Sequence, residues 1–212
     1  AEGEIGHGSM PFLGVNAIDA MLPLLEAFRN ELVPKLSQRR TAMPIVPAEA
    51  RLATLNINAI QGGQAGEDIQ TPCVADHCEV IFDRRYLPEE GFDSTKREIE
   101  ELVRRVESES PERKYRISDL MVVHPVEAPR DSRLVAALEQ GIRSVTGNTA
   151  TLVASPGTYD QKHFARIAGV RHCVAYGPGP LEEAHQPDES CSVDDLVASA
   201  QVMALAALEL VG

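Results

Sequence analysis

Tryptophan is absent from the 212 residues, and aromatic residues of every kind make up only 4% of them, so we expect an aliphatic core. The sequence has no run of about 18 apolar residues, and it therefore predicts no transmembrane helix. It also does not start with a basic segment followed by an apolar one, so we expect no secretory signal.

Cysteine is scarce as well. The four cysteines are Cys73, Cys78, Cys173 and Cys191, and no two of them form a C-x-x-C pair. The spacing of the first two is longer than a zinc knuckle uses. We interpret all four as free thiols in a reducing compartment, which predicts a cytoplasmic protein.

Basic residues are fewer than acidic residues. Twenty Lys and Arg stand against 32 Asp and Glu, which gives a formal net charge of −12 and a pI near 4.9. Nucleic acids and anionic membranes attract basic surfaces, so we expect neither as a partner. The hydrophobic content of 43% is sufficient for a packed core and argues against disorder.

The first block of the chain, residues 1–127, mixes helices with alternating strands. Asn16 can cap a first helix, whose end is marked by Pro34 and the basic residues after it. The remaining elements predicted here are a strand over 51–60, a strand over 78–82, a helix from Asp93 and a strand over 116–123. A β-α-β-β-α-β unit needs one more strand at the front, and only residues 2–7 are available for it. We therefore expect the first strand to be truncated.

The second block, residues 128–212, follows a linker rich in proline and charge. Helices are predicted over 132–145, 160–168 and 192–210, and short apolar strands over 149–154 and 170–176. This alternation indicates an α/β layer with a mostly parallel sheet. Two strands are few for such a sheet, which suggests that further strands belong to it.

Several residues could carry chemistry, each with a plainer alternative. His185, in an acidic loop, can bind a metal ion or lie free at the surface. His7, between two glycines, can reach a ligand or serve as an ordinary loop residue. Arg84 and Arg85, after a strand, can clamp a carboxylate or form surface ion pairs. The turn over 155–160 can hold an anion or simply begin a helix.

The familiar self-contained catalytic motifs are missing. The sequence contains no HExxH, no GxSxG, no Walker loop and no GxGxxG. By motif counting alone, the chain does not hold a complete active site.

Four segments taken together are more specific. They are HGSMPFLGVNAI (7–18), FDRRYLPEE (82–90), SPGTYDQKHFA (155–165) and YGPGPLEEAHQPDE (176–189). In this order and spacing they resemble the C-terminal half of the co-catalytic zinc amidohydrolases: acetylornithine deacetylases, succinyl-diaminopimelate desuccinylases, aminoacylases and glutamate carboxypeptidases. The resemblance covers essentially the whole chain.

The resemblance implies an α/β fold in two parts. Residues 1–127 correspond to a ferredoxin-like lid, an antiparallel sheet with two helices that mediates dimerisation, with its first strand truncated. Residues 128–212 correspond to the C-terminal αβαβα portion of a zinc-peptidase-type catalytic domain. A homodimer through the lid is expected.

The resemblance also implies a chemistry. Two zinc ions per full-length subunit, or cobalt in their place, activate a water that attacks the amide of an N-acyl amino acid or small peptide. By position, His185 matches a metal ligand, His7 matches a histidine that stabilises the oxyanion in the partner's site, and Arg85 matches an arginine that binds the substrate carboxylate. Gly157 and Thr158 match a turn that hydrogen-bonds the substrate, although Tyr159 is inserted there.

The family's other metal ligands and its general base precede the lid, and none lies in these residues. One ligand cannot hold a catalytic zinc, which needs about three from the protein. We therefore expect this chain alone to be inactive and to bind zinc weakly, the N-terminal half of the catalytic domain being its missing partner. The alternative is a non-catalytic dimerisation or binding module derived from the same family.

Overall fold

The computed structural model describes residues 1–64, 72–184 and 186–212. It divides into two compact units, which interleave along the chain. Unit 1 comprises Ala1–Ala42 and Arg51–Val122, and unit 2 comprises Met43–Ala50 and Val123–Gly212. The assignment of Met43–Ala50 to the second unit was not predicted from the sequence.

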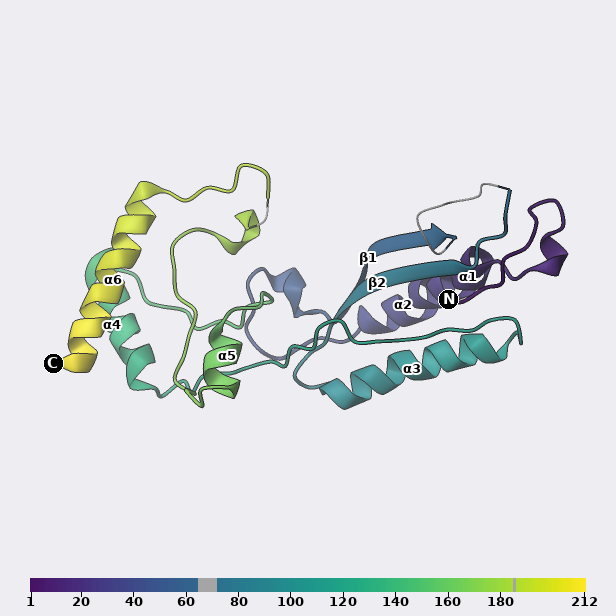
Figure 1. Cartoon of the computed structure of the whole chain (residues 1–212). Coiled ribbons are helices and arrows are strands. Elements are labelled where there is room, and N and C mark those ends of the chain that lie inside the picture. The colour runs from purple at the N-terminus through teal and green to yellow at the C-terminus, as the bar shows by residue number, and fades with distance from the viewer. Residues whose placement is uncertain (65–71, 185) are drawn as a thin grey trace. The chain divides into compact units, whose positions relative to one another are not determined.

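Unit 1 begins its regular structure with one long helix in three pieces: α1 (Ala17–Ala27), the π-helical turn η2 (Phe28–Leu32) and α2 (Val33–Leu36) (Figure 1). The predicted cap is confirmed, because Asn16 Oδ1 accepts hydrogen bonds from the Ile18 and Asp19 amides. The helix passes Pro34, where its end was predicted. A proline ring clashes with the carbonyl four residues earlier, and a wide π turn at that point relieves the clash.

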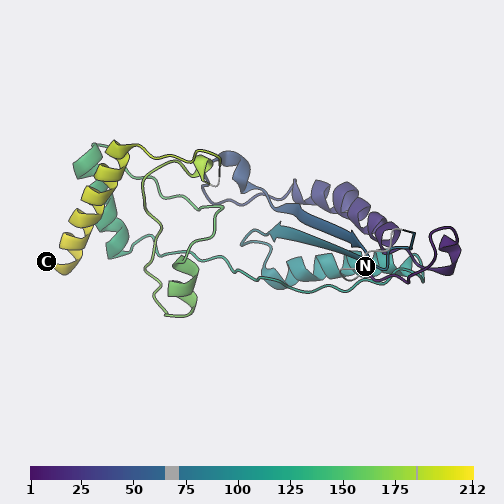
Figure 2. The same ribbon diagram turned by 45° about the horizontal axis from the view of Figure 1, so that its top comes forward.

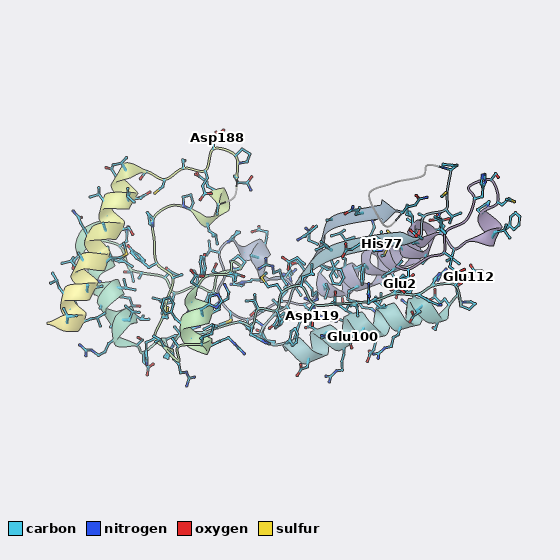
Figure 3. All side chains as sticks on the ribbon, viewed as in Figure 1. Glu2, His77, Glu100, Glu112, Asp119 and Asp188 are labelled. Carbon is cyan, nitrogen blue, oxygen red and sulfur yellow. The ribbon has the colours of Figure 1, made fainter. Side chains whose placement is uncertain are left out.

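The sheet of unit 1 pairs β1 (Thr54–Gly63) with β2 (His77–Arg85) in antiparallel fashion. On the other side of β2, single bridges join Glu2 to His77 and to Lys114. Figure 3 labels Glu2 and His77, which lie at the same end of the sheet. The backbone order is thus β1, β2, the N-terminal segment, and the chain at Lys114. This is the order of a ferredoxin-like sheet in which the N-terminal segment and the chain at Lys114 are reduced to single bridges.

A bulge in β1 corrects one prediction. Strict alternation through the strand predicted over residues 51–60 would place Ala59 on the same face as Leu55 and Ile57. The register shifts between Ile57 and Ala59, so that Ala59 pairs with Ile81 while Ile60 pairs with Val80. One extra residue in a strand reverses the faces that follow it, which is the physical reason for the error.

Helix α3 (Phe92–Ser108) completes unit 1. Both views show α1, α2 and α3 running along the two strands (Figures 1 and 2). The ring of Phe28, in the buried core, packs on the partly buried ring of Phe82 with centroids 5.2 Å apart. The buried core cluster consists of Ala17, Met21, Leu24, Ala27, Phe28, Leu32, Leu36, Ala53, Cys78, Leu87, Ile99, Leu102, Val103 and Val106.

The strand predicted over residues 116–123 is wrong. That segment is irregular, and Ile117, Leu120 and Met121 are exposed. An apolar alternation can form a strand only beside a partner backbone. Here the N-terminal segment pairs with Lys114, before the predicted strand begins.

Unit 2 is built on three helices: α4 (Arg133–Thr146), α5 (Gln161–Arg166) and α6 (Val193–Val211). Ser132 and Ser192 cap α4 and α6, and both helices begin directly after these residues, where helices were predicted to start. Helices α4 and α6 pack side by side (Figure 1). A Cβ on Gly141 of α4 would lie 3.1 Å from the Val202 carbonyl oxygen, so glycine permits this close approach.

The strands predicted over residues 149–154 and 170–176 are not formed among the described residues. The single backbone pairing at these segments is a parallel bridge between Ile45 and Ala154. Leu152, Val153 and Val170 are correspondingly exposed. The apolar runs have the composition of buried strands, but the described part of unit 2 does not supply a ladder beside them. In the same described residues, no helix is both long enough and apolar enough to cross a membrane.

Candidate functional site

His7 lies in a loop that the backbone holds from both sides. Glu4 and Val15 exchange two hydrogen bonds at the base of the loop, 2.8 and 2.9 Å long. His7 itself bridges Cys73 across an antiparallel contact, and the neighbouring Gly8 amide donates to the Pro72 carbonyl. A Cβ on Gly8 would lie 2.6 Å from that oxygen, so any other residue there requires the loop to shift.

His7 is exposed, and Ser9 contacts its ring. Its Nδ1 lies 3.2 Å from the Ser9 amide nitrogen, which donates to it, and 2.8 Å from Ser9 Oγ. Ser9 was not predicted as a site residue. A signal existed, because polar side chains often hydrogen-bond the backbone two residues on in a turn, and His-Gly-Ser has that spacing.

The tip of the same loop is apolar and exposed. The short 3-10 helix η1 (Pro11–Leu13) carries Phe12, which is 79% exposed, next to the exposed side chains of Met10 and Leu13. These side chains form an exposed apolar patch that lies outside the core of unit 1.

Arg84 and Arg85 point to opposite faces of β2 and have different surroundings. The Arg84 side chain is 5% exposed and donates to Glu90 at 2.5 Å. The Arg85 side chain is 53% exposed, and its guanidinium contacts Asp83 Oδ2 at 2.8 Å. The geometry therefore gives Arg84 a structural ion pair and leaves Arg85 accessible to a ligand.

Glu90 is the hub of a half-buried ionic network. It accepts from Arg84, from Arg39 at 2.8 Å and from the Leu87 amide at 2.7 Å. Burial alone would raise the pKa of the Glu90 carboxyl, but these hydrogen bonds together outweigh burial and lower that pKa below its ordinary value. Arg39 also binds Glu98 at 2.6 Å, which ties α3 to the chain after α2.

His7 and Arg85 lie toward opposite ends of β2. His7 bridges Cys73, which precedes the strand, whereas Arg85 is its last residue. Figure 1 shows the purple loop of His7 beyond the end at which β2 starts. A nine-residue strand with a rise of about 3.3 Å per residue separates its ends by roughly 26 Å. Within unit 1, the two side chains cannot contact one small molecule together.

Gly157 and Thr158 belong to unit 2, in an exposed turn before α5. The Gly157 amide donates to Ser155 Oγ at 3.0 Å, and that oxygen lies 3.0 Å from the Tyr159 hydroxyl. The inserted Tyr159 is thus integrated into the turn. A ligand that takes the Gly157 amide has to displace the Ser155 hydroxyl.

His185, the predicted metal ligand, lies outside the described residues. The loop after it is described: Asp188, labelled in Figure 3, has a φ of 63°, and Ser190 Oγ donates to Glu183 at 3.0 Å. Among residues 1–64, 72–184 and 186–212, no group of three or more His, Cys, Asp or Glu side chains is placed to hold a metal ion.

Comparison with known proteins agrees with this architecture. Residues 1–111 match the peptidase dimerisation domain of the M20 family. The chain is 29% identical to an acetylornithine deacetylase of Vibrio parahaemolyticus, over 91% of this chain and 46% of that protein. It is also 29% identical to a succinyl-diaminopimelate desuccinylase of Psychrobacter arcticus, over 94% of this chain and 44% of that protein. The chain spans about half the length of these curated relatives.

Solved structures share the fold. An M20 family metallo-carboxypeptidase, Sso-CP2 from Sulfolobus solfataricus, superposes with a TM-score of 0.62 at 17% identity, over 99% of this chain and 55% of that one. The aminopeptidase PepT from Bacillus cereus superposes with a TM-score of 0.58 at 19% identity, over 100% of this chain and 50% of that one. From the match over residues 1–111, we conclude that the chain belongs to the M20 peptidase family and carries its dimerisation domain.

Proposed function

We propose that the chain is part of a metal-dependent hydrolase that cleaves the amide bond of an N-acyl amino acid or small peptide. The names of the relatives that match nine-tenths of the chain, a deacetylase and a desuccinylase, support this reaction class. In this proposal the metal is zinc, His185 is one of its ligands, and the other ligands and the general base come from an N-terminal half of the catalytic domain. The enzyme works as a cytoplasmic homodimer.

The observation that carries the proposal is the separation of His7 from Arg85 along β2. Two side chains at opposite ends of a strand roughly 26 Å long cannot act on one small substrate within a subunit. They can do so if each reaches a different active site, and a homodimer formed through residues 1–111 provides two. Arg85 then serves the site of its own subunit, and His7 serves the site of the partner.

The roles of the side chains follow from their surroundings. Arg85 is exposed and bound to Asp83, so a substrate carboxylate can replace or join that contact with a charge-assisted hydrogen bond. His7 is exposed and Ser9 contacts its Nδ1, so its Nε2 can donate to a developing oxyanion. The bound metal would supply the activated water, and Gly157 and Thr158 would orient the substrate.

A heterodimer experiment tests the arrangement directly. In the polypeptide encoded by the whole gene, we expect His7→Ala to lower kcat about 10²- to 10³-fold. We expect Arg85→Met to raise KM for a carboxylate substrate about tenfold or more. Co-expression of the two variants forms heterodimers in which one site has both native side chains. Random pairing then restores about a quarter of wild-type activity.

The outcomes separate the alternatives. Activity that stays at the level of the single variants would place both side chains in one site and would overturn the arrangement. Absence of any hydrolysis by the whole gene product would favour the second candidate, a non-catalytic dimerisation module, which the family match over residues 1–111 suits equally.

Metal content gives an independent check. Elemental analysis of this chain alone should find far less than one zinc per chain, because catalytic sites need about three protein ligands. A value near two zinc ions per chain would contradict the proposed division of ligands between two halves. Apo-enzyme of the whole gene product should regain hydrolysis on addition of zinc.

A further inference from the structure

We propose that Ser9 is a positioning residue that fixes the tautomer and the orientation of the His7 ring. The inference deepens the proposed function and depends on it for its catalytic meaning. The structural part, however, concerns two adjacent residues of this chain and can be measured without any activity.

The backbone around His7 forms a tight turn. The Met10 amide donates to the His7 carbonyl at 2.8 Å, which closes a β-turn with Gly8 and Ser9 at its centre. The turn directs the Ser9 amide back toward the ring that precedes it. The bridge of His7 to Cys73 and the contact of Gly8 with Pro72 hold the same turn in place.

The two contacts of Ser9 with Nδ1 determine where the ring proton resides. A backbone amide can only donate, so the 3.2 Å contact from the Ser9 nitrogen requires Nδ1 to accept. In a neutral imidazole the proton is then on Nε2. The Ser9 hydroxyl, 2.8 Å from the same Nδ1, adds a second donor. Both residues are exposed, where water competes for a single bond, so two donors hold the ring better than one.

This tautomer is the one that oxyanion stabilisation requires. A neutral ring with its proton on Nε2 presents a donor to solvent, while the opposite tautomer would present a lone pair and repel a developing negative charge. Ser9 thus acts on the reaction through His7 and does not itself contact the substrate.

Nuclear magnetic resonance of the chain tests whether Ser9 fixes the tautomer of the His7 ring. In neutral solution, the long-range proton–nitrogen pattern of the His7 ring should show Nε2 protonated and Nδ1 unprotonated, with no second tautomer. Ser9→Ala should bring the ring toward the tautomer mixture of free imidazole, because one of two donors is lost. Ser9→Thr keeps the hydroxyl and should retain the wild-type pattern.

A matched control is Ser37→Ala, whose hydroxyl bonds the Pro34 carbonyl of its own helix; it should leave the His7 signals unchanged. A wild-type ring with Nδ1 protonated would overturn the inference, and so would a Ser9→Ala spectrum identical to the wild type.

Kinetics of the whole gene product test the catalytic meaning. Ser9→Ala should lower kcat roughly tenfold with KM unchanged, and Ser9→Thr should restore it. An unchanged kcat in Ser9→Ala would overturn the positioning role. The gene product could show no hydrolysis while the resonance pattern is as expected. In that case the proposed function fails, and the effect of Ser9 on the His7 tautomer is still supported.

Discussion

The two units differ in how completely they bury their own apolar residues. The continuous core cluster, from Ala17 to Val106, lies entirely in unit 1, where helices and strands cover one another. In unit 2 the buried apolar residues are Val135, Ala137, Val202 and Ala206, at the contact of α4 with α6. Its exposed large apolar residues include Phe164, Ile167, Leu196, Val197, Met203, Leu205, Leu208 and Val211.

The difference shows what a folding unit needs. A helix that is apolar on more than one face must pack against more than one neighbour. Helix α6 has α4 on one side and apolar side chains such as Leu208 and Val211 on others. Unit 1 therefore has the features of an independently folding domain, and unit 2 has those of part of a larger layer. In our proposal, the N-terminal half of the catalytic domain would cover the exposed apolar side chains of unit 2.

The largest expected effects come from core substitutions, one in each unit, which test whether the two units unfold independently. Phe28 is 1% exposed and packs on Phe82. The substitution Phe28→Ala should therefore lower the free energy of unfolding by about 3–5 kcal/mol. Val202→Ala in α6 removes two methyl groups and should cost about 2 kcal/mol. Amide exchange should lose protection in unit 1 for the first variant and in unit 2 for the second. Loss of protection in both units for either variant would contradict independent unfolding.

The next prediction contrasts two adjacent arginines. Arg84→Met removes a buried partner of Glu90 and should cost about 3 kcal/mol. Arg85→Met, at an exposed position, should change stability by less than about 0.5 kcal/mol. Urea denaturation of both variants measures the difference. Equal losses would show that the two side chains do not differ in role as their burial indicates.

Acid should weaken unit 1 through Glu89 and Glu90. Hydrogen bonds from the Thr41 hydroxyl and nearby backbone amides lower the pKa of Glu89, and the Glu90 network lowers that of Glu90 despite burial. The folded chain therefore binds these protons less readily than the unfolded chain, whose ordinary value is 4.5. Their contribution is present above pH 4.5 and is lost as the pH falls through the lowered values.

Denaturant unfolding at a series of values between about pH 6 and about pH 3 tests this contribution. Glu90→Gln should flatten the dependence of stability on pH, because a titrating group is removed. Glu112→Gln, at an exposed position labelled in Figure 3, serves as the control and should keep the wild-type slope. A slope unchanged by Glu90→Gln would refute the assignment.

The smallest expected effect concerns the His7 loop. Gly8→Ala places a Cβ 2.6 Å from the Pro72 carbonyl oxygen and should cost about 1 kcal/mol, because the exposed loop can shift. The Val74 amide, which donates to Gly6 at 2.7 Å, should exchange faster. Gly177→Ala in unit 2 meets no atom within 4 Å and is the control. Unchanged exchange at Val74 would show that the loop does not depend on this close approach.

The same contrast between units explains what the sequence could predict. Helices depend on local signals: Asn16 is the cap that the sequence predicted, and α4 and α6 begin directly after residues 132 and 192, where helices were predicted to start. Strands depend on a partner that the local pattern does not contain, so the strands predicted over 116–123, 149–154 and 170–176 are absent from the described structure.

For the site, alternation along β2 from the buried Cys78 would have placed Arg84 inward and Arg85 outward. The link from Ser9 to His7 was missed although the His-Gly-Ser spacing allows it, because the spacing shows that a turn is possible and only the structure shows that it forms. The metal-binding role of His185 stays a prediction.

The interleaving of the two units along the chain has a consequence for cutting the protein apart. The backbone crosses between units three times, after Ala42, after Ala50 and after Val122. A protease that cleaves one crossing leaves the units tethered by the others. A polypeptide ending at Val122 would still carry Met43–Ala50, whose Pro44 carbonyl would have lost the Ala154 amide that donates to it at 2.7 Å. Isolating the dimerisation domain cleanly therefore calls for replacing Met43–Ala50 with a short linker as well as ending the chain.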